Sequence, residues 1–355
     1  MPDERRAIRG RGTAVNPPNR YERLAYVEDL EPSDEQDEER LPRTELLRDS
    51  SRTIIARNDS PDVGFEASIN PYRGCEHGCA YCYARPSHEQ LGFSSGLDFE
   101  TKILVKENAP ELLRHELASP RWKPQPIALS GVTDPYQPIE RRLQITRRCV
   151  EVLADFRNPV AVVTKNYLVT RDVDYLAELA RYDAALVFVS VTTLDAALQG
   201  KLEPRASTPA RRLAAIEALA RAGVPVGVMV APIIPAVNDH EIPAILTAAA
   251  RAGATAAGHV MLRLPYAVKE LFERWLEAHL PDRKDKVLSR VRELRGGQLN
   301  DPQFGSRMRG TGPYASSVNA LFAAACRRVG LNQRRRLLST AAFRRPEGSQ
   351  LSLFR

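Results

Sequence analysis

The sequence predicts an α/β fold built on a parallel β-sheet, and three observations support it. Short apolar or β-branched runs alternate with amphipathic helical patterns six times between residues 67 and 263. The helical patterns stop at glycine, as RRLAAIEALARAG does at 211–223. A chain of 355 residues is long enough for one large α/β domain with extensions. Six such units form either an open, barrel-like sheet or a doubly wound one.

The elements divide the chain into four predicted parts. Residues 1–55 are polar and charged, and DLEPSDEQDEER at 29–40 is typical of disorder, so we predict a largely disordered N-terminal segment. Ordering of NPPNRY at 16–21 against the body is the alternative for that stretch. A core domain over 56–280 is followed by a basic helical extension over 281–345 and a tail over 346–355. The core strands are predicted at 67–72, 126–131, 160–164, 185–191, 225–231 and 259–263, with helices at 109–118, 144–156, 174–182, 209–223 and 239–253. In the extension we predict helices at 282–294 and 317–330, joined by a glycine-rich loop.

Charge and composition restrict the function. Residues 281–355 hold 16 Lys and Arg against 5 Asp and Glu, which favours a polyanionic partner such as nucleic acid, although a solvated arginine-rich surface fits equally well. The candidate phosphate contacts are RMRGTGPYA at 307–315 and Arg334, Arg335 and Arg336. No run is long enough to span a membrane, and MPDERRAIRGRG lacks a secretory signal. We therefore expect a cytoplasmic protein with reduced thiols.

Three of the five cysteines lie in GCEHGCAYC at 74–82, directly after the first predicted strand. The spacing of Cys75, Cys79 and Cys82 is CxxxCxxC. Three thiolates in one loop suit an iron–sulfur cubane that keeps one iron open. His77 would complete a Cys₃His zinc site, which remains an alternative. A redox pair of Cys79 and Cys82 would leave Cys75 unexplained.

Polar residues recur where the predicted strands end. In a parallel sheet these carboxyl ends meet at one edge, where ligands bind. PIIPAVND at 232–239 ends the fifth strand and offers backbone groups. The candidate side chains are Ser130, Lys165, Ser190 and Arg205.

The cysteine loop and the six βα units resemble the radical S-adenosylmethionine (SAM) superfamily over residues 65–270. Tyr81, just before the last cysteine, fits that family's pattern. The resemblance implies a partial (β/α)₆ TIM-like barrel, a [4Fe–4S] cluster held by the three cysteines, and reductive cleavage of SAM to a radical that abstracts hydrogen. It also implies a reductant such as flavodoxin or ferredoxin. By this resemblance the cofactor-binding residues are Tyr81, Ser130, Lys165, Ser190 and Arg205.

GCEHGCAYCYA and LSGVTDPYQPIE are most similar to the spore photoproduct lyase branch, which repairs a thymine dimer in DNA. The resemblance implies radical return through Tyr83 and a substrate side lined by Asp134 and Tyr136. The lyases carry a hydrogen-donor cysteine just before the serine, whereas Ala128 and Leu129 stand there in this chain. We therefore expect DNA lesion repair or base modification rather than photoproduct reversal. Radical modification of a protein or small metabolite, and a non-catalytic Cys₃His zinc module that binds nucleic acid, are the alternatives.

The chain ends in GSQLSLFR, which resembles the peptide that docks bacterial repair proteins on the DNA sliding clamp. Such peptides bind in an extended form with apolar anchors in pockets. A terminal apolar strip that folds back on the body is the alternative. The expected docking residues are Gln350, Leu351, Leu353 and Phe354.

Overall fold

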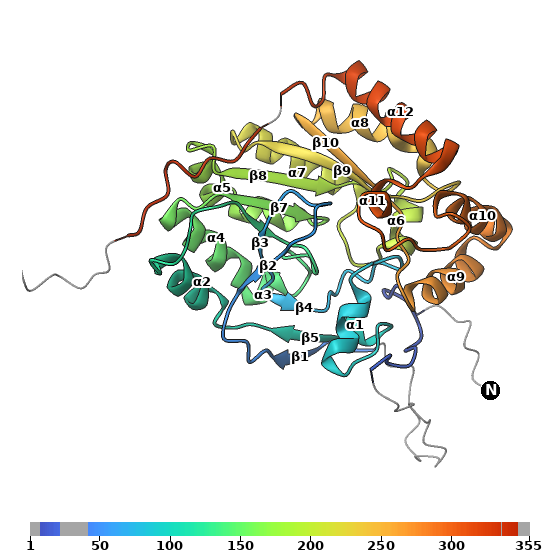
Figure 1. Cartoon of the computed structure of the whole chain (residues 1–355), viewed down its shortest axis with the longest axis horizontal. Coiled ribbons are helices and arrows are strands. Elements are labelled where there is room, and N and C mark those ends of the chain that lie inside the picture. Colours follow the sequence, from blue (N-terminus) through green and yellow to red (C-terminus); the bar gives the residue numbers. More distant parts are fainter. Residues whose placement is uncertain (1–7, 22–41, 335, 347–355) are drawn as a thin grey trace, which may run out of the picture.

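The computed structural model describes residues 8–21, 42–334 and 336–346 and is built around one curved seven-stranded sheet (Figure 1). Six of its strands are parallel and follow the six predicted apolar runs, which confirms the α/β prediction and the partial barrel. Only β2, at one edge, runs antiparallel to its neighbour. Across the sheet the strands are β10 (Ala256–Met261), β9 (Val226–Ile233), β8 (Ala185–Ser190), β7 (Val160–Thr164), β6 (Ile127–Leu129), β3 (Ala67–Ile69) and β2 (Ile55–Arg57).

Helices cover the outer face of this sheet because each crossover between parallel strands returns on the same side. β3 and β6 are buried throughout and β8 is mostly buried, as Val187 and Val189 illustrate with no exposed surface. The crossover helices are α2 (Ala109–Ala118), α4 (Ile145–Phe156), α5 (Val173–Ala180), α7 (Pro209–Arg221) and α8 (Ile242–Arg251), with shorter helices α1 (Asp98–Thr101), α3 (Glu140–Leu143) and α6 (Ala196–Leu202). Four 3₁₀ turns span Arg85–Leu91, Tyr167–Asp172, Asp239–Glu241 and Pro281–Arg283.

A second, three-stranded sheet lies beside the cysteine loop and was not predicted. It pairs β1 (Glu45–Arg48) with β5 (Lys102–Val105), and β5 with β4 (Tyr72–Arg73). Residues 8–21, which we call the N-terminal strap, also pack on the body. The prediction of a largely disordered segment over 1–55 therefore does not hold for residues 8–15 and 42–55, and residues 16–21 order against the body, which was the alternative for that stretch. Hydrogen bonds to partners far away in sequence hold these residues, and a composition rule does not detect such bonds.

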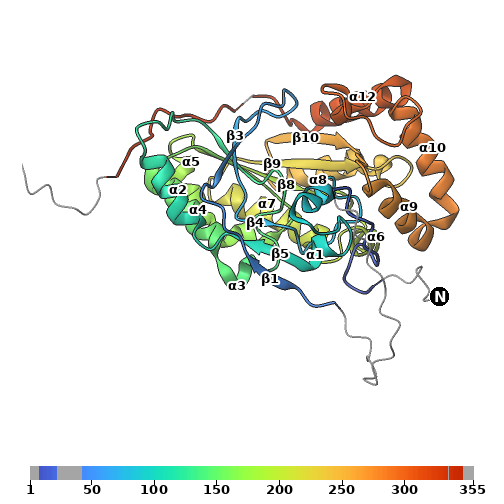
Figure 2. The same cartoon turned by 60° about the horizontal axis from the view of Figure 1, so that its bottom comes forward.

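The C-terminal extension consists of α10 (Lys284–Leu294), α11 (Ser306–Arg309) and α12 (Gly312–Val329) (Figure 1, Figure 2). It follows α9 (Val268–His279), a helix at the end of the core domain that was not predicted. α12 begins before the predicted 317–330 because Pro313, near its first position, lacks an N–H that the helix would have to satisfy. It packs along α8 and ends at Gly330, which adopts a left-handed conformation. No helix among the described residues is apolar over enough of its length to cross a bilayer.

After α12 the chain crosses the amino ends of the sheet strands as a C-terminal strap, residues 332–346 without the undescribed 335. The amide of Asn332 bonds Thr255 just before β10, and that of Ser339 bonds Asp183 just before β8. Arg345 reaches the carbonyls of Ser119 and Trp122, which precede β6. The C-terminal strap therefore lies at the opposite end of the barrel from the carboxyl ends of the strands.

Candidate active site

The cysteine loop leaves the sheet after β3 and β4 and folds back over the carboxyl ends of the strands. Gly74 and Gly78 have φ of 82° and 65°, in the left-handed region that favours glycine. Cys75 and Cys79 are buried, and Cys82 is half-buried. Cys82 packs against the apolar group around Cys75 and also against the one around Cys79. The loop therefore places the three cysteines in two adjoining apolar groups that share Cys82.

The donor set is three cysteine thiols in one loop, which suits an iron–sulfur cubane. All three cysteines are free thiols, and burial raises their pKa values, so without a metal they stay protonated. Among the described residues, no three His, Cys, Asp or Glu side chains gather as they would around one ion. A cubane holds its cysteines farther apart, since each binds a different iron.

His77 is unsuited to complete a Cys₃His site. Its Nε2 lies 3.1 Å from the side-chain nitrogen of Asn166, and its Nδ1 lies 3.4 Å from Oδ2 of Asp134. Both ring nitrogens thus face partners from the ends of neighbouring strands, and burial lowers the His77 pKa. The zinc module is therefore not supported by this geometry.

A buried arginine holds the back of the loop. Arg85 donates from Nε and Nη2 to the carbonyl of Cys79, at 3.1 and 2.9 Å, and forms an ion pair with Glu100. The other oxygen of Glu100 accepts from the amide of Gly12 in the N-terminal strap at 3.0 Å. A Cβ at Gly12 would lie 1.8 Å from the carbonyl oxygen of Gly78, so the strap touches the loop backbone itself.

A fully paired polar group lies below the loop, and we call it the floor network. At its centre is Glu203, without exposed surface, which accepts from the hydroxyls of Tyr81 and Thr192 and from the guanidinium of Arg212. Lys165 Nζ lies 3.5 Å from the same carboxylate. Burial alone would raise the Glu203 pKa, but the charges of Arg212 and Lys165 outweigh it and lower that pKa well below its usual range.

The predicted strand-end residues do meet at this edge. Ser130 follows β6 with φ of 144°, Lys165 follows β7, and Ser190 ends β8. Lys165 donates to the carbonyl of Ala231 at 3.0 Å as well as facing Glu203. Arg205 instead points to the cysteine loop, where it pairs with Glu76 at 3.0 Å.

The three residues expected on the substrate side have different environments. Tyr83 is exposed, and its hydroxyl donates to the carbonyl of Gly131, 2.7 Å away. Asp134 accepts from the Thr164 hydroxyl and from the amide of Lys165, both at 2.7 Å, so it ties β6 to β7. The prediction for Tyr136 is wrong, because its side chain lies without exposed surface in the main hydrophobic core.

Sequence reasoning missed the buried charges of the site. Glu203 and Arg212 lie in GKLEPRAS and on α7, where they look like surface residues of a helical region. Arg85 follows the cysteine motif directly and was not singled out. The available signal for this buried pair was the opposite charge of Glu203 and Arg212 beside an apolar helical pattern, because charged side chains that are buried must be paired.

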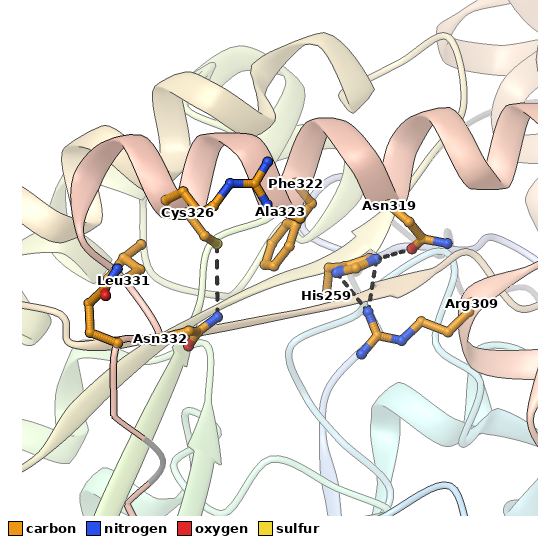
Figure 3. Close-up of a pocket in the computed structure, with 10 residues that line it drawn as sticks. His259, Arg309, Asn319, Phe322, Ala323, Cys326, Leu331 and Asn332 are labelled. Carbon is orange, nitrogen blue, oxygen red and sulfur yellow. Dashed lines mark hydrogen bonds between the residues drawn. The ribbon is translucent and has the colours of Figure 1, made fainter.

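Two further features lie away from the cysteines. A cavity of about 640 Å³ opens between β10 and α12, where His259 contacts Asn319 and Arg309 (Figure 3). None of the residues predicted for the cluster, SAM or the substrate side lines it, whereas Arg309, which lines it, belongs to the predicted phosphate contacts at 307–315. The expected clamp-docking residues Gln350, Leu351, Leu353 and Phe354 lie outside the described residues, as does Arg335, whereas Arg336 lies 4.0 Å from Asp183 at the amino ends of the strands.

An uncharacterised protein of Mycobacterium tuberculosis is 38% identical to this chain over 248 residues, which cover 69% of this chain and 72% of the relative. An uncharacterised protein of Methanocaldococcus jannaschii is 29% identical over 199 residues, which cover 56% of this chain and 71% of the relative. A spore photoproduct lyase variant bound to AdoMet and dinucleoside spore photoproduct has a similar fold, with TM-score 0.59, 16% identity, and coverage of 81% of this chain and 80% of that one.

The family profile described as the radical SAM superfamily matches residues 69–249, from the end of β3 through α8. This range contains the cysteine loop, the floor network and the strand-end residues. The cofactors of this family are a [4Fe–4S] cluster and SAM, and Cys75, Cys79 and Cys82 are the residues that would hold the cluster here. The matched range, the three-cysteine loop and the partial barrel agree, and the chain belongs to the radical SAM superfamily of enzymes.

Proposed function

We propose that this radical SAM enzyme acts on nucleic acid, in DNA lesion repair or base modification. The observation that carries the proposal is a group of arginines at the carboxyl end of β10. Arg263 follows that strand, and Arg307 and Arg309 lie on α11, which packs against it. Buried Arg295 bonds the carbonyls of Leu262 and Arg307 and so joins α11 to the strand. Guanidinium groups gathered beside an active site suit a phosphate backbone.

Arg263 is the member of this group best placed for a ligand. Burial, followed by the charge of Arg307, lowers its pKa, and its Nε has no hydrogen-bond partner among the described residues. Its guanidinium lies 5.1 Å from the ring centre of Tyr83, directly after Cys82. A phosphate or other anion bound there would satisfy the buried cation.

The residues of the chain have separable tasks in this proposal. Together the cluster and SAM supply one-electron chemistry that allows a hydrogen atom to be taken from the substrate. Ser130, Lys165 and Ser190 hold SAM at the strand ends, and the floor network fixes Lys165 and Tyr81. Tyr83 contacts the substrate and takes part in hydrogen transfer. Its hydroxyl, fixed beside the Ser130–Gly131 turn, is what supports this role.

The reaction differs from that of the lyases in our proposal. The lyases that the fold resembles include one bound to dinucleoside spore photoproduct. Ala128 and Leu129, which stand just before Ser130, are buried in β6 and carry no thiol. A substrate radical formed here has no cysteine donor at that position, so we propose a base lesion or base modification other than the photoproduct.

The test is anaerobic. The protein is reconstituted with iron and sulfide, given SAM and dithionite, and assayed for 5′-deoxyadenosine with intact DNA, UV-irradiated DNA or no DNA. We expect nucleic acid to increase 5′-deoxyadenosine formation and a modified nucleoside to appear in the digest. Equal formation without nucleic acid would discard the substrate, and would favour the alternative of a protein or small-metabolite substrate. No formation by a fully loaded protein would contradict SAM cleavage itself.

Three partners or settings complete the proposal. A reduced flavodoxin or ferredoxin supplies the electron, and the reaction takes place in the cytoplasm, where thiols stay reduced. The QLSLF tail docks on a DNA sliding clamp. The C-terminal strap supports this last step, because it carries the chain away from the carboxyl ends of the strands before the tail begins.

A further inference from the structure

The exposed aromatic side chains gather on one surface. Of the aromatic residues that the structure describes, four are more than a third exposed, at 49–61%. A tyrosine or phenylalanine left in water carries a hydrophobic cost unless it has a partner, so a grouping of all four indicates a binding surface. They are Tyr21, Tyr83, Tyr266 and Phe304.

Each of these rings is stacked with an arginine. The guanidinium of Arg20 lies 3.5 Å from the ring centre of Tyr266 and 5.2 Å from that of Tyr21. Arg263 lies over Tyr83, and Arg307 lies 4.4 Å from the centre of Phe304. Together these seven residues form what we call the rim.

The rim is continuous around the carboxyl ends of the strands. Arg263 links two of its pairs, since its Nη1 lies 3.5 Å from the Met308 sulfur on α11, next to Arg307. Tyr266 follows Arg263 by three residues, and Arg20 joins it to the turn after the cysteines through an ion pair with Glu89. Arg307 is fixed by an ion pair with Asp62, in the loop between β2 and β3. These contacts span the open side of the barrel, from β10 to β2.

We propose that the rim binds a single-stranded or locally unpaired stretch of nucleic acid. Its bases would stack on Tyr266, Phe304 and Tyr83, and the guanidinium groups would contact the phosphates. Stacking of this kind accepts any base and requires that the base be unpaired, because paired bases present only their edges. The inference rests on the proposed nucleic-acid substrate and specifies its form.

The charge of the rim favours a polyanion over a peptide. Arg20 and Arg307 each have one carboxylate partner, whereas the Arg263 cation contacts a sulfur and a ring. Each ring lies beside an arginine and is still 49–61% exposed, so part of its surface is available for stacking. An acidic, tyrosine-containing peptide is the competing occupant, and the test includes it.

The test measures binding to the reconstituted protein without SAM or reductant, by fluorescence anisotropy of a labelled oligothymidine. We expect the single strand to bind at least tenfold more tightly than its duplex with oligoadenine. Tyr266→Ala and Phe304→Ala should each weaken binding about fivefold or more, the usual loss per stacked base. Arg263→Gln should reduce the slope of log K against log salt by about 0.7, the value for one phosphate contact on a single strand.

Two controls lie at the other end of the barrel. Leu337→Ala removes an exposed apolar side chain from the C-terminal strap, and Arg221→Gln removes an exposed cation at the end of α7. Neither should change binding. The unfolding midpoint of each rim variant is measured as well. Where a variant fails to fold, the same substitution is made at another residue of the rim.

Other results would overturn the inference. Tighter binding of the duplex than of the single strand would contradict it, and so would unchanged binding in all three rim variants. It would also be contradicted if a copolymer of glutamate and tyrosine displaced the strand at a lower concentration than unlabelled oligothymidine does. If duplex DNA still stimulated 5′-deoxyadenosine formation in that case, the proposed function would stand without this surface.

Discussion

Tyr81 and Tyr83 flank Cys82 and have opposite surroundings. Tyr81 is 6% exposed and donates its hydroxyl to Glu203 in the floor network, whereas Tyr83 is 49% exposed and lies on the rim. Burial and the Glu203 charge raise the pKa of Tyr81, so its hydroxyl stays a donor. Tyr81 and Tyr83 lie in a tight turn, in which the amide of Cys82 bonds the carbonyl of Cys79 and the amide of Arg85 bonds the carbonyl of Cys82. This turn lets one cysteine motif contribute to both regions. The floor network is satisfied by residues of the chain itself, whereas the rim leaves four aromatic rings partly exposed.

The strongest way to break the floor is Glu203→Gln. Arg212 and Lys165 would then keep their charges without the carboxylate, and loss of one member of a buried ion pair costs about 3–5 kcal/mol. We expect a corresponding fall in the free energy of unfolding, measured by urea titration. Because the Glu203 pKa is lowered by folding, the wild type should lose this advantage as the pH falls below about 4.3, the ordinary glutamate value.

Glu111→Gln is the matched control for this substitution. Glu111 lies 3.9 Å from Arg148 with 67% of its side chain exposed, so the change should be below about 1 kcal/mol. Equal losses at Glu111 and Glu203 would mean that the floor network does not stabilise the fold.

Gly12→Ala tests the contact between the N-terminal strap and the cysteine loop. The new methyl group would overlap the carbonyl of Gly78, and crowding of this kind costs about 1–3 kcal/mol. We expect a lower unfolding midpoint and faster bleaching of the cluster in air. In Gly200→Ala, at a helical site with open space around it, both should stay at or above the wild-type level. Identical bleaching rates in the two variants would show that the strap does not protect the loop.

Tyr81→Phe removes one donor from the buried Glu203 carboxylate. The expected cost is about 1–3 kcal/mol, the penalty for an unsatisfied buried group, although Thr192 and Arg212 still bond the carboxylate. Thermal unfolding of the reconstituted protein measures it. A more stable Tyr81→Phe protein would place this tyrosine outside the floor.

Tyr83→Phe should have the smallest effect on stability and a large effect on turnover. Its hydrogen bond to Gly131 is exposed, so the loss of stability should be below about 1 kcal/mol. If the hydroxyl takes part in hydrogen transfer, 5′-deoxyadenosine should still form while the modified nucleoside disappears. Full product formation by Tyr83→Phe would leave this residue with a stacking role alone.

The sequence predicted those parts of the molecule that depend on local pattern. The six parallel strands follow from apolar runs, and Cys75, Cys79 and Cys82 follow from their spacing. Residues whose role depends on distant partners were missed or misplaced. Glu203 is buried because Arg212 and Lys165 converge on it from other elements, and Tyr136 turns into the core although its motif suggested the substrate side. Residues 45–48 pair as a strand only because β5 offers an edge.

The C-terminal strap also fixes the end of the barrel at which the described chain stops. Its last described residue, Pro346, follows Arg345, which is fixed beside the start of β6, at the end of the barrel opposite the rim. Anything attached beyond that point, whether a natural partner, a fusion domain or a solid support, is joined on the side that faces away from the substrate. An enzyme tethered in this way would keep its active site turned outward, toward whatever passes in front of it.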